Sequence, residues 1–258
     1  MSEPVHISSR DNALLVRLRK LAHDPAAYRK LGAVWLEGDH LCEALRARGR
    51  PAAHAVITES AWRDERLRRL AGWAAKVSIV AEAQLKGFST LETPAPIGFV
   101  LDAPADGAIE PGAASVVLDR LQDPGNVGSI LRSAAALGVT QVLAIKGTAA
   151  LWSPKVLRAG MGAHFALRLV EALDEAALDV LQVPLLATSS HAGQALRDAA
   201  LPWPCAWVLG HEGQGVSTPL QARCLLKLRI PQPGGEESLN VSAAAAICFY
   251  ESVRSRVN

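Results

Sequence analysis

The chain has 258 residues, and half of them are hydrophobic, which is enough for one or two well-packed cores and argues against intrinsic disorder. Its 27 Lys and Arg residues against 25 Asp and Glu residues give a formal net charge of only +2. No apolar run approaches the roughly 20 residues that span a bilayer, and the N-terminus MSEPVHISSRDN lacks the apolar core of a signal peptide, so we expect a cytoplasmic protein.

The first hundred residues alternate between helical and extended patterns. Residues 9–23 predict a helix capped by Ser9, with leucines along one stripe. Short strands are predicted at residues 33–36, 54–58 and 77–80, and further helices at residues 40–48, 61–75 and 81–86. This alternation is typical of a small α/β domain, which we place at residues 1–101.

Positive charge is concentrated in this first part. Residues 1–105 carry 15 Lys and Arg against 12 Asp and Glu, whereas residues 106–258 carry 12 against 13. The basic side chains that could face RNA are Arg10, Arg17, Lys20, Arg29, Lys30, Arg46, Arg48 and Arg50. Ordinary solubilising charge explains the same composition, so both interpretations stay open.

The segment DAPADGAIEPGA, residues 102–113, has no apolar period and predicts a linker. A second domain is expected at residues 114–258. Its predicted strands are residues 115–119, 141–145, 166–170, 185–189, 205–209 and 224–230. The predicted helices between and beside them are residues 127–137, 154–161, 173–181, 195–200 and 218–222. Apolar strands separated by helices predict a parallel sheet that is covered on both faces.

The four cysteines indicate no special chemistry. Cys42, Cys205, Cys224 and Cys248 are far apart and form no C-x-x-C pair, which argues against a zinc site and against a disulfide framework. We expect them to be small buried hydrophobic residues, and we expect no metal.

The first turn with chemical content follows the strand at residues 115–119. Asp123 to Asn126 predict a turn, and Arg132 in the following helix is placed to bind a phosphate with two parallel hydrogen bonds. A surface arginine paired with a carboxylate is the alternative. The glycine spacing is not G-x-G-x-x-G and no acid ends the next strand, so a nicotinamide-dependent oxidoreductase is disfavoured.

The second turn, VLGHEGQGVS, places glycines around Glu212. Such glycine density permits close approach of the backbone to a ligand, and the carboxylate is either a helix cap or a recognition group. His211 has no Ser or Cys nucleophile placed near it by the sequence, so we do not assign it a catalytic role.

The third turn is IPQPGGEESLN, between a strand that ends at Pro231 and a helix for which Asn240 is the predicted N-cap. One interpretation is a capped helix packed on a sheet. The other is a cradle for a small molecule, with free N–H groups at the helix start. Together the three turns predict a cluster at the strand ends, made of Asn126, Arg132, Glu212, Ser238 and Asn240.

These three segments resemble known motifs. DPGNVGSILRSAAALG, LGHEGQGVS and IPQPGGEESLNVSAAAA are similar, in this order, to the motifs of the SpoU (TrmH-type) RNA 2′-O-ribose methyltransferases of the SPOUT superfamily. ISSRDN and VWLEGDHLCEAL resemble that family's N-terminal substrate-binding domain, a small α/β fold similar to certain ribosomal proteins. The resemblance implies S-adenosylmethionine as methyl donor, an RNA ribose 2′-hydroxyl as acceptor, a homodimer, and a trefoil knot in the C-terminal domain.

The resemblance also implies roles for individual residues. The donor would be bound by backbone around Gly210, Ile230 and Leu239, and the reacting residues would be Arg132, Asn126, Glu212, Ser238 and Asn240. Arginine is a poor base because its pKa exceeds 12, so we expect Arg132 to hold a phosphate and stabilise the developing alkoxide. We expect ribosomal rather than transfer RNA as substrate. A noncatalytic RNA-binding dimer on the same fold is the alternative.

Overall fold

The computed structural model describes residues 3–104, 107–189, 193–234 and 238–254. The chain divides into two compact units. Unit 1 comprises Met1–Ala105 together with Trp152–Phe165, and unit 2 comprises Asp106–Leu151 together with Ala166–Asn258. Among the described residues, no helix combines the length and the apolar character needed to cross a membrane.

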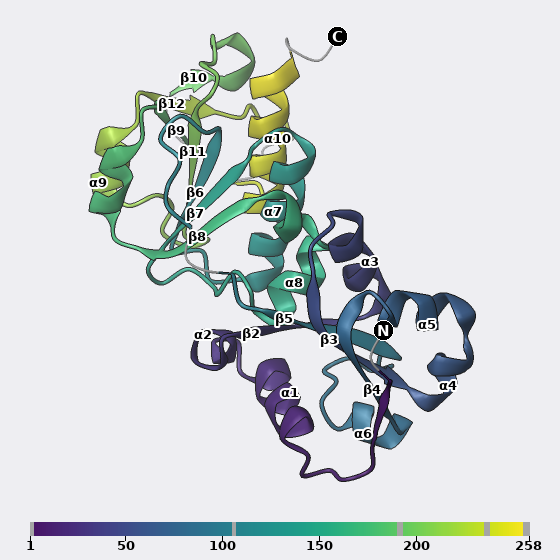
Figure 1. The fold of residues 1–258 in the computed structure, drawn as a ribbon. Coiled ribbons are helices and arrows are strands. Elements are labelled where there is room, and N and C mark those ends of the chain that lie inside the picture. The colour runs from purple at the N-terminus through teal and green to yellow at the C-terminus, as the bar shows by residue number, and fades with distance from the viewer. Residues whose placement is uncertain (1–2, 105–106, 190–192, 235–237, 255–258) are drawn as a thin grey trace. The chain divides into compact units, whose positions relative to one another are not determined.

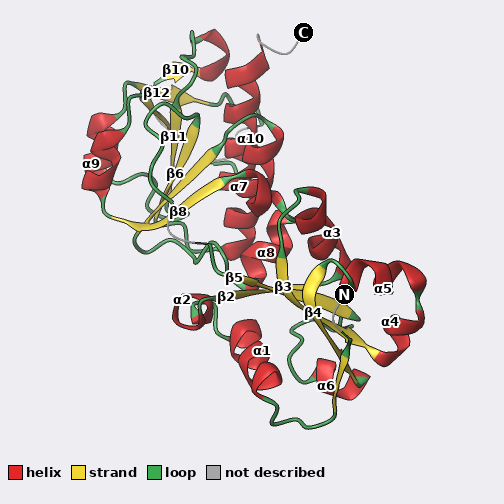
Figure 2. Ribbon diagram, viewed as in Figure 1, coloured by secondary structure: helices red, strands yellow, loops and turns green. Residues whose placement is uncertain are grey.

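Unit 1 contains a five-stranded mixed sheet with helices around it (Figures 1 and 2). Its strands are β1 (Val5–Ile7), β2 (Ala33–Glu37), β3 (Ala52–Thr58), β4 (Ala74–Val80) and β5 (Ile97–Asp102). Its helices are α1 (Ala13–His23), α2 (Ala27–Leu31), α3 (Asp39–Ala47), α4 (Glu59–Arg63), α5 (Glu65–Ala71), α6 (Glu82–Lys86) and α8 (Pro154–Gly160), and a 3₁₀ helix η1 runs over Ala163–Ala166 at its end. The strand order is β1-β4-β3-β5-β2, and β5 runs antiparallel to both of its neighbours.

The three strands predicted in this region are confirmed, but β1 and β5 were not predicted. β1 has only three residues and is mostly exposed, so it carries little hydrophobic pattern. β5 contains Gly98, which weakens a strand pattern in sequence. In the structure a Cβ at Gly98 would lie 2.1 Å from the ring of Trp35, so the glycine makes room for that buried indole.

Two helix predictions in unit 1 were wrong in detail. The single helix predicted over residues 61–75 is divided into α4 and α5, because Asp64 has an extended backbone and its side chain accepts a hydrogen bond from the Leu67 N–H, which starts a new helix. The cap of α1 is Asn12 rather than Ser9: Asn12 Oδ1 accepts from the Leu14 N–H at 2.9 Å.

Unit 2 contains a seven-stranded sheet in which every described pair of strands is parallel. Its strands are β6 (Ser115–Asp119), β7 (Gln141–Ile145), β8 (Arg168–Leu173), β9 (Leu185–Thr188), β10 (Gln194–Ala195), β11 (Ala206–Gly210) and β12 (Leu226–Arg229). Its helices are α7 (Pro124–Ala136), α9 (Thr218–Arg223), α10 (Val241–Val253) and the short 3₁₀ helices η2 (Glu175–Val180) and η3 (Leu196–Asp198). The order is β10-β12-β9-β11-β6-β7-β8.

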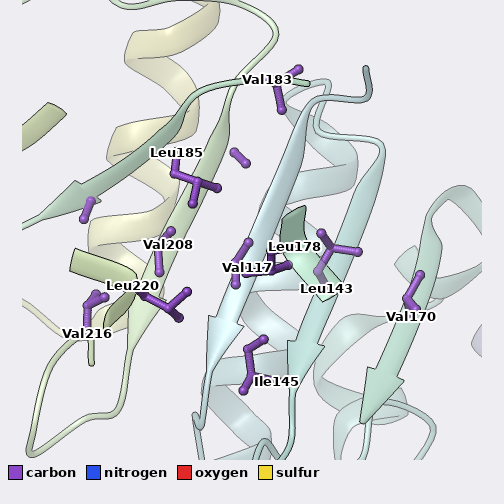
Figure 3. Close-up of a cluster of buried hydrophobic side chains, with 12 residues drawn as sticks. Val117, Leu143, Ile145, Val170, Leu178, Val183, Leu185, Val208, Val216 and Leu220 are labelled. Atoms are coloured by element: carbon purple, nitrogen blue, oxygen red, sulfur yellow. The ribbon is translucent and has the colours of Figure 1, made fainter. Parts of the chain in front are cut away.

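Both faces of this sheet are covered, as the apolar strands predicted. One face packs against η2 and α9 through a cluster that includes Val117, Val208, Leu178 and Leu220 (Figure 3). Side chains alternate along a strand, so Trp207, next to Val208, points to the other face. There its indole N–H donates to Ser252 Oγ of α10 at 2.9 Å in a fully buried hydrogen bond.

The parallel sheet and its six predicted strands are confirmed, with shifts of a few residues at their ends. The predicted helices over residues 173–181 and 195–200 are the 3₁₀ helices η2 and η3, and α7 begins at Pro124, three residues earlier than predicted. The four cysteines are free thiols, three buried and Cys224 half-buried.

Candidate active site

The site is built where β6 and β11, neighbouring parallel strands, both end. Asp119, the last residue of β6, lies beside Gly210, the last residue of β11. Because the strands are parallel, the loops that follow them leave from the same edge of the sheet, the usual place for ligands in an α/β fold. The motif segments that the sequence placed far apart therefore meet at this edge.

Two carboxylates, one at the end of β6 and one after β11, each accept hydrogen bonds from the loop of the other strand. Asp119 is fully buried, and its Oδ2 accepts from the Ser217 N–H of the loop after β11 at 2.6 Å. In return, Glu212 of that loop accepts from the Gln122 N–H at 3.3 Å and from the Asp123 N–H at 3.2 Å. Both of these backbone donors stand immediately before α7, whose N-cap is Asp123, so Glu212 holds the start of that helix from another strand's loop.

The environment of Glu212 favours its charged form. Partial burial on its own raises the pKa of Glu212, but hydrogen bonds from backbone N–H groups and from the Asn126 amide outweigh that effect and hold the pKa below its usual value. Glu212 is therefore a carboxylate at neutral pH. An ionised acceptor with several donors is a positioning group rather than a proton donor.

Asn126 links all three motif segments. Its Nδ2 donates to Glu212 Oε1 at 3.2 Å, and its Oδ1 accepts from Asn240 Nδ2 at 2.9 Å. Asn240 in turn begins α10, because its Oδ1 accepts from the Ser242 N–H at 2.9 Å, which confirms the predicted cap. The chain Asn240–Asn126–Glu212 thus fixes the starts of α7 and α10 relative to the loop after β11.

A cavity of about 600 Å³ lies beside this network. Six of the predicted site residues line it: Gly210, Glu212, Ile230, Ser238, Leu239 and Asn240. Asn126 does not line the cavity but is joined to it through Glu212 and Asn240. The cavity also has lining residues that the sequence analysis did not assign, among them Thr188 and Ser189 at the end of β9, and Gln232. Nothing in their local sequence distinguishes them, since only the sheet order brings β9 beside β11.

Arg132 stands apart from the other predicted residues. It is exposed on α7, six residues beyond Asn126, which is about 9 Å along a helix axis. It does not line the cavity, and it makes no hydrogen bond or ion pair with any residue that the structure describes. The alternative of a surface arginine held by a carboxylate therefore has no support in the described part of the chain.

Gly210 is required by the loop itself. A Cβ there would lie 2.0 Å from both the carbonyl carbon of Gly215 and the nitrogen of Val216. The loop returns this closely because the Gly215 N–H donates to the His211 carbonyl at 2.8 Å and Gly215 has a φ of +70°. His211 also closes the turn, as its Nδ1 accepts from the Gly213 N–H at 3.0 Å. The close backbone approach expected at Gly210 is therefore an approach to the chain's own backbone, at Gly215 and Val216.

The cavity suits a small cationic nucleoside. Its volume is in the range of ligand sites, and Leu209, Ile230 and Leu239 give it apolar walls. Its described lining includes the carboxylate of Glu212 and no Lys or Arg, which favours a positively charged guest such as a sulfonium. Within the described residues, no group of three or more His, Cys, Asp or Glu side chains is arranged to hold a metal ion.

Comparison with known proteins agrees with this site. Residues 113–250 match the model of the SpoU rRNA Methylase family. The chain is 33% identical to an uncharacterised tRNA/rRNA methyltransferase of Synechocystis sp. over 99% of this chain and 96% of that protein. It is 30% identical to the 23S rRNA (guanosine(2553)-2′-O)-methyltransferase RlmP of Bacillus subtilis, over 95% of this chain and 97% of the relative.

A solved structure gives the same result for the fold. The SpoU methyltransferase AviRb from Streptomyces viridochromogenes, in complex with the cofactor AdoMet, superposes with a TM-score of 0.86 at 25% identity and covers 95% of this chain and 98% of its own. The motif segments, the site that they form and these similarities agree with one another. The chain belongs to the SpoU rRNA methylase family and is an S-adenosylmethionine-dependent RNA 2′-O-methyltransferase.

Proposed function

We propose that this methyltransferase modifies a ribose in ribosomal RNA, with residues 114–258 supplying the chemistry and residues 1–101 supplying RNA affinity. Support for the ribosomal target comes from relatives such as RlmP, whose name specifies 23S rRNA and a guanosine. The observation that carries the chemical part is the hydrogen-bonded chain Asn240–Asn126–Glu212 beside the cavity. It joins three segments that are distant in sequence. Ordering their polar side chains costs conformational entropy, which a simple packing contact would not require.

The methyl donor would be held by backbone around Gly210, Ile230 and Leu239, all of which line the cavity. When bound, S-adenosylmethionine supplies a methyl group that is already activated by its positively charged sulfur. The protein's task is then to place a ribose hydroxyl and to make its proton easier to remove. The network of Asn126, Glu212 and Asn240 holds the loops that do the placing.

Arg132 is proposed as the group that stabilises the ribose 2′-oxygen as it becomes negative. A guanidinium stays charged at all working pH values, so it cannot remove the proton as a literal base. It can bind an RNA phosphate and the developing oxyanion at once, while the proton leaves to phosphate or water. Its exposure and its lack of partners among the described residues leave all five donors available.

We further propose that the chain works as a cytoplasmic homodimer and that the C-terminal domain is threaded as a trefoil knot. The dimer is supported by α10, where Ala243, Ile247 and Tyr250 are exposed at helical spacing, with 37% of Ile247 and 55% of Tyr250 accessible. A stripe of this kind on a helix that otherwise faces the core is typical of a subunit interface. Sedimentation of the purified chain tests the dimer, and Tyr250→Asp should shift it towards monomer.

The function is tested by supplying the purified chain with methyl-labelled S-adenosylmethionine and two substrates, 23S rRNA from a strain that lacks the protein and total transfer RNA. We expect label in the ribosomal RNA, recovered after nuclease digestion as a single 2′-O-methyl nucleoside. Label on a base, or label in transfer RNA alone, would contradict the proposal. Mass spectrometry of RNA from the deletion strain, showing loss of the same nucleoside, identifies the position.

A further inference from the structure

Unit 1 contains a second cavity, of about 680 Å³. It lies where β3 and β4 begin and the antiparallel β5 ends. The register of these strands makes His54, Lys76 and Val100 neighbours across the sheet. Its wall is apolar where Leu14 of α1 and Leu45 of α3 contribute to it. A hollow of this size can hold a nucleoside.

The rim of this cavity is positive. Arg17, Arg50 and Lys76 line it against the single lining carboxylate of Asp102. Arg50 and Lys76 are exposed and make no hydrogen bond or ion pair through their side chains with any described residue, whereas Arg17 donates to the Leu31 carbonyl at 2.8 Å. Burial first, and then the charge of Lys76, lower the pKa of His54, so this ring is neutral at pH 7 and adds a hydrogen-bonding group instead of a charge.

Some of the positive charge elsewhere in unit 1 is held in ion pairs. Arg66 pairs with Asp39 at 2.7 Å, Arg46 with Glu43 at 2.7 Å. These acids are on α3, and neither of them lines the cavity. The free cations of Arg50 and Lys76 therefore give this cavity an attraction for anions that the composition of the chain does not reveal.

An exposed tryptophan adjoins the same rim. Trp73 immediately precedes β4, is 42% accessible, and its indole N–H donates to the carbonyl of Arg50 at 2.8 Å. That hydrogen bond fixes the ring while a large part of it stays accessible. Two other aromatic residues of unit 1, Tyr28 and Phe88, are both buried and cannot stack on a ligand. Trp73 is thus a rigid aromatic surface next to two unpaired cations.

We propose that this cavity binds an unpaired nucleotide of the RNA substrate. Arg50 and Lys76 bind the phosphates on either side, the base enters the apolar wall beside Leu14 and Leu45, and a neighbouring base stacks on Trp73. The nucleotide is unpaired because bases in an RNA duplex are stacked inside the helix and cannot enter a protein cavity. The inference rests on the proposed function in that it takes RNA as the substrate.

The first test uses the full chain and a fluorescein-labelled single strand of twelve uridines, with a twelve-base-pair RNA duplex as the competing probe. The double variant Arg50→Ala, Lys76→Ala removes the two unpaired cations. We expect roughly tenfold weaker binding of the single strand and a salt slope smaller by about 1.4, since each phosphate contact to a single strand contributes about 0.7. The duplex should bind more weakly than the single strand to the unaltered chain.

The matched control is Arg63→Ala, Arg68→Ala, which removes the same charge from exposed positions on α4 and α5 that do not line the cavity. It should leave the affinity unchanged within about twofold and the salt slope unchanged. Equal losses in the two double variants would mean a general effect of net charge and would overturn the proposal. Tighter binding of the duplex would overturn it as well.

Trp73 gives an independent measurement. Stacking on an aromatic ring contributes about 1–3 kcal/mol per base, so Trp73→Ala should weaken binding of the uridine strand about fivefold or more, and Trp73→Phe should retain most of the affinity. Equal affinity of Trp73→Ala and the unaltered chain for the uridine strand would contradict the proposed stacking of a base on Trp73. A chain that binds the strand through these residues but methylates no RNA would refute the proposed function alone. Normal binding by the Arg50 and Lys76 variant of an active enzyme would refute this inference alone.

Discussion

Asn12 in unit 1 and Asn240 in unit 2 begin helices in the same way. Each side-chain Oδ1 accepts from the backbone N–H two residues later, at 2.9 Å in both cases. Only Asn240 has a second task, because its Nδ2 donates to Asn126 and so reaches the network of Glu212. The same asparagine N-cap therefore stabilises a helix in unit 1 and also positions the site in unit 2, and only its tertiary placement makes the difference.

The contrast extends to the charged groups of the two units. In unit 2 the polar groups of the strand ends bind one another, and their positions are fixed before a ligand arrives. In unit 1 two of the three cations at the rim of the cavity, Arg50 and Lys76, have no such partners among the described residues. Chemistry requires fixed geometry, whereas attraction of a polyanion requires only charge that is free to move.

The largest expected effect concerns Arg132, the one predicted site residue that neither joins the network nor lines the cavity. Arg132→Ala should lower single-turnover methylation of the native RNA by roughly 100- to 1,000-fold, as expected for loss of a donor to a developing oxyanion, and Arg132→Lys by less. Affinity for S-adenosylmethionine, measured by calorimetry, should barely change. Arg197→Ala, at a 74% exposed arginine of η3, is the matched control. Near-normal turnover of Arg132→Ala would contradict the catalytic role.

The next effect separates two glycines of one loop. Gly210→Ala places a Cβ 2.0 Å from the backbone of Gly215 and Val216, whereas at Gly213 the nearest atoms are ring atoms of His211 at 3.8 Å. Overpacking of this kind costs about 1–3 kcal/mol, so we expect roughly 10- to 100-fold weaker cofactor binding in Gly210→Ala and little change in Gly213→Ala. Calorimetry decides, and equal affinities in the two variants would show that the loop relaxes without cost.

The third prediction tests the two asparagines directly. Asn12→Ala and Asn240→Ala should each lower the free energy of unfolding by about 1 kcal/mol, because each removes a helix N-cap. Only Asn240→Ala should also slow methylation, by roughly tenfold, since Asn126 loses a partner and the site loses its alignment. Urea unfolding and single-turnover rates give the two values. If Asn12→Ala slowed methylation equally, the distinction between a cap and a site residue would be lost.

The smallest effect is a dependence of stability on pH. The folded-state pKa of Glu212 lies below its ordinary value of 4.5, so its stabilising contribution is present above pH 4.5 and is lost as the pH falls through the lower folded-state pKa. Glu212→Gln should therefore cost about 1 kcal/mol at pH 7, a modest amount for a partly exposed group, and the difference from the unaltered chain should shrink below pH 4.5.

Unfolding curves of both proteins between pH 7 and pH 3 measure this difference. Glu92→Gln, at an exposed carboxylate of unit 1, is the control and should show no difference at any pH. A constant gap between Glu212→Gln and the unaltered chain down to pH 3 would show that the hydrogen bonds depend on shape and not on charge.

The sequence by itself determined six strands of the sheet in unit 2 and the residue types of the site. Alternating apolar strands gave the parallel sheet, and Asn240 was recognised as a cap because the signal is local: a short polar side chain directly before a run of small residues. Helix division at Asp64 and the capping of α1 by Asn12 were misjudged, since several polar residues near each start could serve and only packing selects one.

Only the tertiary structure decided how those residues are used. Glu212 binds the backbone just before α7 because β11 lies beside β6, an adjacency between strands more than eighty residues apart that no local pattern encodes. Gly210 is needed because its own loop folds back against it, and Arg50 and Lys76 line one cavity because the sheet register places the start of β4 beside the start of β3. Sequence specifies which groups are present, whereas the sheet order decides which of them meet.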